Sequence, residues 1–147
     1  MNRKTLLFCT LTVLITSFFL LISGSSILNY SLNKENTLPL GTFITWFGIK
    51  ALPLSIFLAI SEFRNPTKKL NTILASLLKI VLVLAFLWIG ISYLLAGNFS
   101  FIFTEKSTFQ GGQLAMNIFW KTTYSLAIIP IFLLMIYLIS KLFNKSN

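Results

Sequence analysis

Residues 80–97, with the sequence IVLVLAFLWIGISYLLAG, decide the fold of this chain, because they form an apolar run inside a segment that has no charged residue between Lys79 and Glu105. A run of this length is typical of a helix that crosses the hydrocarbon core of a bilayer. Three further runs have the same character and occur at residues 6–22, 42–61 and 122–140. The sequence therefore predicts an all-α integral membrane protein whose four transmembrane helices form an antiparallel bundle.

The composition agrees with this assignment. The 147 residues are 56% hydrophobic and 10% charged, whereas soluble domains have about 25% charged residues, and the mean hydropathy is +0.85. A soluble globular domain and a disordered chain are thus both excluded. We expect residues 1–147 to form a single polytopic membrane domain, with helices at about 5–23, 42–61, 70–97 and 120–141, outer loops at 24–41 and 98–119, and a cytoplasmic loop at 62–69.

Several kinds of chemistry are excluded by residue types that the chain lacks or has only once. There is no His and no Asp, Cys9 is the one cysteine, and the three acidic residues are Glu35, Glu62 and Glu105. Metal clusters, haem ligation by His, Ser-His-Asp triads and paired-cysteine redox centres all require residues that are missing. We therefore expect no enzymatic activity, no cofactor and no bound metal. A membrane enzyme that acts on lipid is a further hypothesis, but the Glu, Ser and Lys residues that it would use form no recognisable constellation.

The basic residues predict the orientation, because short loops rich in Lys and Arg stay in the cytoplasm. Four spans place seven basic residues on the side of both termini, namely Arg3, Lys4, Arg64, Lys68, Lys69, Lys141 and Lys145. The opposite side has three, namely Lys34, Lys106 and Lys121. Both termini are therefore predicted to be cytoplasmic, and we assign the net charge of +9 to lipid anchoring rather than to nucleic acid. The high content of Phe, Ile, Asn and Lys fits an AT-rich bacterial or mobile-element gene, and the expected location is the bacterial inner membrane.

The first predicted helix has a row of small or weakly polar side chains along one face. Rows of this kind let two membrane helices approach closely and form hydrogen bonds. The row predicts a packing face, either within this chain or between two chains. It consists of Thr5, Cys9, Thr12, Thr16 and Ser23.

The predicted outer loops are longer than a helix hairpin needs, and they contain patterned aromatic residues. Phe99, Phe101 and Phe103 alternate with other residues, as in a strand, and residues 27–32 show a weaker alternation. One interpretation is a small two-stranded β element in the outer loops. The other, which we weigh equally, is that these rings belong to an aromatic belt at the membrane surface together with Trp46.

Lys50 is the most informative residue for function. The helix between Lys50 and Glu62 is about 17 Å long, so Lys50 lies within the outer half of a core of about 30 Å if this helix crosses it. A buried ammonium requires snorkelling to the near headgroups, an ion pair with Glu35, with Glu105 or with another chain, or a role in a substrate or proton site.

Pro53 and Pro130 interrupt the hydrogen bonding of the second and fourth helices at similar depth. Two kinks at one depth open a small pocket or let the helices bend around a neighbour. The alternative is that both prolines are packing features without a further role.

These features predict a non-enzymatic inner-membrane protein that binds another integral membrane protein, as an accessory or assembly subunit or as an inhibitor of the immunity or exclusion type. The alternative is a small oligomeric channel or transporter that uses Lys50. Besides the lipid bilayer, the expected partner is another integral membrane protein or a second copy of this chain. The candidate contact residues are Lys50, Trp46, Pro53, Pro130, Phe99, Phe101, Phe103 and Glu105.

Overall fold

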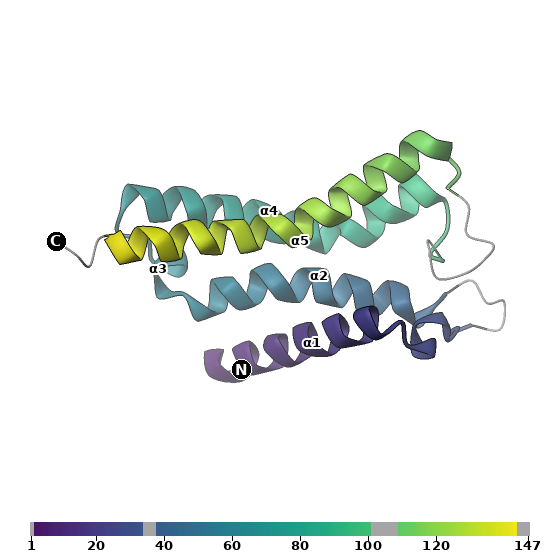
Figure 1. The fold of residues 1–147 in the computed structure, drawn as a ribbon, viewed down its shortest axis with the longest axis horizontal. Coiled ribbons are helices and arrows are strands. Elements are labelled where there is room, and N and C mark those ends of the chain that lie inside the picture. The colour runs from purple at the N-terminus through teal and green to yellow at the C-terminus, as the bar shows by residue number, and fades with distance from the viewer. Residues whose placement is uncertain (1, 34–37, 101–108, 144–147) are drawn as a thin grey trace.

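The computed structural model describes residues 2–33, 38–100 and 109–143. Within these ranges, four helices are long and apolar enough to cross a membrane, namely α1 (Arg3–Ser23), α2 (Leu40–Ala59), α4 (Lys69–Ala96) and α5 (Gly112–Phe143). Two short helices complete the fold (Figure 1), η1 (Ser26–Asn29) after α1 and α3 (Ser61–Arg64) between α2 and α4. The prediction of an all-α protein with four membrane-spanning helices is confirmed.

Local signals in the sequence set the ends of the helices. The side chain of Asn2 caps α1 by accepting a hydrogen bond of 3.4 Å from the Lys4 N–H, and Gly24 ends this helix with a φ of 59°. Gly97 ends α4 in the same left-handed conformation, with a φ of 73°, and its N–H donates to the carbonyl of Tyr93. Such φ values are strained for a residue with a Cβ atom, which explains glycine at both positions.

Helix α2 lies at the centre of the bundle. It packs against α1 on one side and against α4 and α5 on the other (Figure 1), and α4 and α5 also pack against each other. Among the described elements, α1 contacts α2 and η1 only. The two helices α1 and α2 approach closely at Gly48, where a Cβ atom would lie 2.9 Å from the Cβ atom of Ser17. The first helix is therefore attached to the bundle mainly through one neighbour.

Buried side chains of α2, α3, α4 and α5 form two apolar clusters. In the first, the Trp88 Nε1–H donates a hydrogen bond of 2.8 Å to the Thr123 hydroxyl, which joins α4 to α5. In the second, the ring of Phe63 lies 5.1 Å from that of Tyr137. Large apolar side chains also cover the outside of the bundle, as expected for helices whose solvent is lipid. The first cluster consists of Ile49, Val81, Ala85, Trp88, Ala96, Phe119 and Leu126, and the second of Ile56, Phe63, Leu74, Ala75, Leu78, Leu133 and Tyr137.

The last helix begins earlier than expected. Helix α5 starts at Gly112 rather than near residue 120, because Ala115 and Phe119 are buried one turn apart and extend its packing face. Gly112 has a φ of 64°, a left-handed conformation that glycine adopts readily, so the chain can turn into α5 at this residue. The second outer loop is correspondingly shorter than the sequence indicated.

The first outer loop folds on itself. Helix η1 takes up part of the segment expected as a strand at residues 27–32, and its short-range hydrogen bonds use N–H groups that a strand would give to a partner. Ser31 and Pro39 form an isolated antiparallel bridge. The described residues contain no strand, and Phe101 and Phe103, expected in the second strand, lie outside them.

The row of small residues on the first helix does not face α2. All five of its side chains are exposed, whereas α1 buries Thr10 and Ser17 on a different face. The reason is that Gly48 of α2 leaves room for Ser17, so the closest packing forms there. Contact between the row and a second chain stays a prediction.

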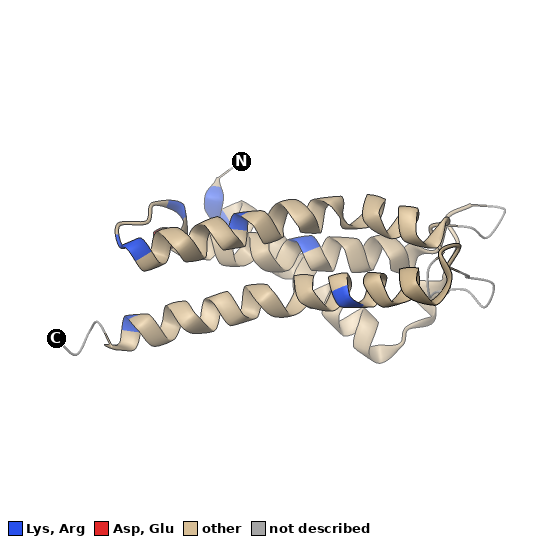
Figure 2. Ribbon diagram, turned by 90° about the horizontal axis from the view of Figure 1, so that it is seen from above, with Lys and Arg blue, Asp and Glu red and all other residues tan. Residues whose placement is uncertain are grey.

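Basic residues gather at the end of the bundle that holds both termini (Figure 2). We call this the basic end, and the opposite end, where the two outer loops lie, the loop end. The described residues of the basic end include Arg3, Lys4, Arg64, Lys68, Lys69 and Lys141.

Candidate functional site

The ammonium of Lys50 lies against aromatic rings. Its Nζ atom is 3.3 Å from the ring centroid of Trp46, 4.3 Å from that of Phe47 and 5.3 Å from that of Phe86. The side chain is 9% exposed. The Trp46 Nε1–H donates 3.2 Å to the carbonyl of Phe86, which fixes the indole ring between α2 and α4. The ring faces offset part of the cost of burying the charge.

The helical spacing explains this arrangement. Lys50 follows Trp46 by four residues and Phe47 by three, so the three side chains share one face of α2. Side chains on a helix lean toward its N-terminus, which for α2 is the loop end. The Lys50 side chain thus extends toward the loop end, the direction that snorkelling to the outer headgroups would take. Glu105, a predicted ion-pair partner, lies outside the described residues.

The other candidate residues are spread over the fold. The carbonyl of Phe99 accepts a hydrogen bond of 2.6 Å from the Thr42 hydroxyl, which ties the second outer loop to the start of α2. Pro53 and Pro130 are fully buried inside α2 and α5. Phe99 also packs on Tyr93, with 4.5 Å between ring centroids. The structure therefore brings Lys50 and Trp46 together and places the remaining described candidates elsewhere.

An apolar groove opens between α1, α2 and α5. Its volume is about 530 Å³, its floor is α2, and its walls are α1 and α5, which do not contact each other. It lies beside both prolines, because its lining includes Ile49 and Leu52 just before Pro53, and Ala127 and Ile131 around Pro130. We call it the α1–α5 groove. It is lined by Leu14, Ile15, Ser17, Phe18, Leu21, Thr45, Gly48, Ile49, Leu52, Thr123, Tyr124, Ala127 and Ile131.

Two hydroxyl groups in the groove have unused donors. Ser17 is 5% exposed and forms no side-chain hydrogen bond with a described residue. The Thr123 hydroxyl accepts from Trp88, and its own O–H donates to no described residue. The α1–α5 groove is thus apolar over nearly all of its lining, and these two hydroxyls present very little surface to it.

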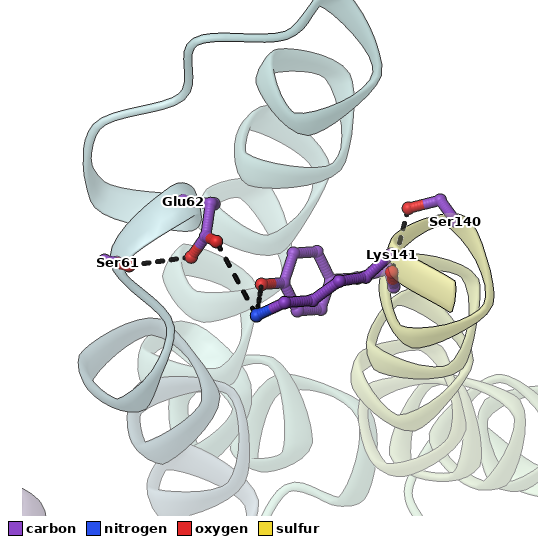
Figure 3. Close-up of polar contacts among 5 residues, drawn as sticks. Ser61, Glu62, Ser140 and Lys141 are labelled. Carbon is purple, nitrogen blue, oxygen red and sulfur yellow. Dashed lines mark hydrogen bonds and ion pairs between the residues drawn. The ribbon is translucent and has the colours of Figure 1, made fainter. Parts of the chain in front are cut away.

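A second, polar pocket lies at the basic end, between the start of α4 and the end of α5. It measures about 310 Å³. Figure 3 shows its ion pair, in which Nζ of Lys141 lies 3.8 Å from a carboxylate oxygen of Glu62 and donates 3.3 Å to the Tyr137 hydroxyl. We call it the basic-end pocket. Its lining residues are Glu62, Thr67, Lys68, Asn71, Tyr137, Ser140 and Lys141.

The environment of Glu62 favours its ionised form. The hydroxyl of Ser61 donates a hydrogen bond of 2.7 Å to the carboxylate. This bond contributes most to lowering the pKa of Glu62 below its usual value, and Tyr137 and the charge of Lys141 add to the effect. Glu62 therefore stays negatively charged across the neutral range.

Sequence reasoning missed both cavities. The signals that were present are weak: Glu62 is the one acid in the predicted cytoplasmic loop, and Lys141 closes the last span. Their contact depends on how α3 and α5 meet, which residue spacing within one helix does not reveal. The α1–α5 groove likewise depends on the absence of contact between the two helices that form its walls.

Comparison of this chain with protein-family models, with curated proteins and with solved structures finds no match. The groove, the basic-end pocket and the Lys50 site are therefore the features that bear on function.

Proposed function

We propose that this chain is a non-enzymatic membrane protein that acts by binding a transmembrane helix of another integral membrane protein. The observation that carries the proposal is the α1–α5 groove, which is lined by apolar side chains and lies between residues 14–21 of α1, 45–52 of α2 and 123–131 of α5. An accessory or assembly subunit, or an inhibitor of the immunity or exclusion type, would use such a surface. We place it in the bacterial inner membrane with both termini in the cytoplasm, in agreement with the distribution of Lys and Arg.

The free hydroxyl donors of Ser17 and Thr123 support a protein helix rather than a lipid chain as the occupant. An acyl chain has no acceptor, whereas a helix offers side-chain oxygens and, where small residues allow close approach, backbone carbonyls. Ala127 is a small residue of α5 in the groove lining, so a second helix can approach α5 there, whereas Gly48 already accommodates Ser17 of α1.

The contacts of Lys50 support this proposal over the second hypothesis, an oligomeric channel or transporter. An ammonium held against Trp46 and Phe86 faces the α2–α4 side of the bundle and does not line the α1–α5 groove. Anion flux through liposomes that is abolished by Lys50→Gln would favour the channel instead.

Site-specific photo-crosslinking tests the proposal in the native membrane. A photoreactive residue at position 127, in the groove, is expected to capture one defined membrane protein. The same residue at position 94, where Leu94 of α4 is 83% exposed and outside the groove, is expected not to. Ala127→Trp, which fills the groove, should abolish recovery of that protein. Equal capture from both positions, or capture of lipid only from position 127, would contradict the proposal.

A second variant pair isolates the hydrogen bond. Ser17→Ala removes a groove hydroxyl, and Thr16→Ala removes a neighbouring exposed hydroxyl that does not line the groove. We expect Ser17→Ala to weaken the complex about threefold, the value of an average interhelical hydrogen bond in a membrane protein. Thr16→Ala should leave the affinity unchanged.

A further inference from the structure

The side chain of Asn71 indicates that the basic-end pocket binds a polar ligand. Its side chain is 7% exposed and lines the pocket, yet it forms no hydrogen bond with any residue that the structure describes. Among the described residues, Nε of Arg64 is the one fully enclosed side-chain polar atom without a partner, so the Asn71 amide keeps accessible surface at the pocket and can pair with a polar ligand there. This observation is independent of the α1–α5 groove, which lies elsewhere in the bundle.

The start of helix α4 adds donors to the same pocket. Lys68 precedes the helix, and no side chain caps it. The first N–H groups of a long helix are unpaired and carry a partial positive charge, which favours a negatively charged ligand. Thr67, Lys68 and Asn71 at this helix start all line the pocket.

The charged residues that line the pocket indicate the sign of the charge on its ligand. Lys68 and Lys141 contribute two positive charges against one negative charge from Glu62. The Glu62 carboxylate already accepts a hydrogen bond from Ser61 and pairs with Lys141, while Lys68 has no described carboxylate within 4.0 Å. An anion with several acceptor oxygens would satisfy Asn71, Lys68 and the helix start together.

We propose that the basic-end pocket binds a phosphate group, held by the Asn71 amide, the N-terminus of α4 and the ammonium groups of Lys68 and Lys141. Leu70 of α4 and Leu142 of α5, close in sequence to the lining residues, are both exposed. A phospholipid headgroup is therefore one source of the phosphate, and a soluble phosphate is the other.

Retention of ligand by the purified full-length protein tests the site. The protein is exchanged into detergent that contains phosphatidylglycerol, diacylglycerol or inorganic phosphate, and bound ligand is detected by native mass spectrometry. Diacylglycerol is the matched lipid that has no phosphate. We expect retention of phosphatidylglycerol and not of diacylglycerol. If inorganic phosphate displaces phosphatidylglycerol, the phosphate group alone is sufficient for binding. If phosphatidylglycerol stays bound in the presence of inorganic phosphate, the lipid is the source of the phosphate. Equal retention of both lipids would overturn the proposal.

Two adjacent lysines provide the matched control. Lys68→Gln should reduce phosphatidylglycerol retention about fivefold, the effect of one basic residue near an anionic headgroup, whereas Lys69→Gln, outside the lining, should change it much less. Equal losses in the two variants would indicate diffuse attraction to anionic lipid and contradict a site.

Substitutions of Asn71 and of Glu62 are expected to change the retention of phosphatidylglycerol in opposite directions. Asn71→Leu should reduce retention without lowering the unfolding temperature, because the amide has no described partner to lose. Glu62→Gln should increase retention, because it removes a like charge from the pocket. Weaker retention in Glu62→Gln would indicate a cationic ligand and overturn the proposal.

Discussion

The contacts of Lys50 show how a charged side chain is accommodated within a membrane-spanning helix. An unpaired Lys at the centre of a span costs about 2.5–3.5 kcal/mol on insertion scales, and here its ammonium contacts the face of Trp46 at 3.3 Å. We expect a double-mutant cycle between Lys50→Met and Trp46→Leu to give a coupling free energy of about 1–2 kcal/mol. Denaturant unfolding in detergent micelles measures it. A coupling near zero would show that the ring does not stabilise the charge.

The same cycle with Trp120→Leu serves as the control. Trp120 packs against Phe119 and Tyr124 of its own helix and forms no described contact with Lys50. Its coupling to Lys50 should be within error of zero, because distant sites contribute additively.

Glu62 predicts a pH dependence of stability. Its pKa is lower in the folded protein than its usual value of 4.5, mainly because Ser61 donates to the carboxylate. The stabilisation is therefore present above the usual pKa and is lost as the pH falls through the lower, folded value. The stability difference between the wild type and Glu62→Gln should be largest near neutral pH and shrink in acid. Thermal unfolding from pH 7 to pH 3 measures this difference.

Ser61→Ala is the companion variant for that measurement. It removes the hydrogen bond with the largest effect on the carboxylate while keeping Glu62 itself. The pH-dependent difference should become smaller in this background. An unchanged difference would assign the lowered pKa of Glu62 to its own backbone N–H, Tyr137 and Lys141 instead.

Individual residues were predictable only where one helix determines their surroundings. Lys50 and Trp46 lie four residues apart, so their contact is implicit in helical spacing, and both were candidates from the sequence. The partners of Glu62 and Asn71 come from other helices. No regularity within the sequence of a single helix specifies them.

At the scale of the element, the attachment of α1 depends on a small residue in α2. Gly48→Ala places a Cβ atom 2.9 Å from that of Ser17, too close for an undisturbed contact. We expect it to lower the free energy of unfolding by about 1–3 kcal/mol, as overpacking does. Adding Ser17→Gly should restore most of the loss, because it removes the opposing Cβ atom.

Gly90 provides the matched control within α4. A Cβ atom there meets nothing within 4 Å. Gly90→Ala should leave the stability unchanged or raise it by up to about 1 kcal/mol through helix propensity. A similar loss in both alanine variants would show that the closeness of α1 and α2 is not the cause.

Helix number and approximate bounds were predictable, whereas the faces that the helices bury were not. Apolar length alone identifies a span, and it identified all four. In a lipid solvent, however, an apolar side chain gains little by turning inward, so hydrophobicity does not mark the packed face. The packed face of α1 is set instead by Gly48 of α2, which leaves room for Ser17, while the row containing Thr12 and Thr16 is exposed.

At the scale of the whole molecule, the fold predicts which segments share a side of the membrane. Cysteines introduced in a Cys9→Ser background at positions 65 and 143, at the basic end, should be labelled by a membrane-impermeant reagent only after permeabilisation. Cysteines at 26 and 113, at the loop end, should be labelled in intact cells. If two positions at the same end of the bundle were labelled under different conditions, the result would contradict the four-span topology.

Among the described elements, α1 contacts α2 and the short helix η1 only, which has a consequence for biogenesis. Because the first hairpin needs no surface from α4 or α5 to complete its own packing, it can reach its final arrangement while the ribosome is still translating the second half of the chain. The α4–α5 hairpin then packs against an α1–α2 hairpin that is already folded, and no contact between α1 and α2 has to break for this to happen.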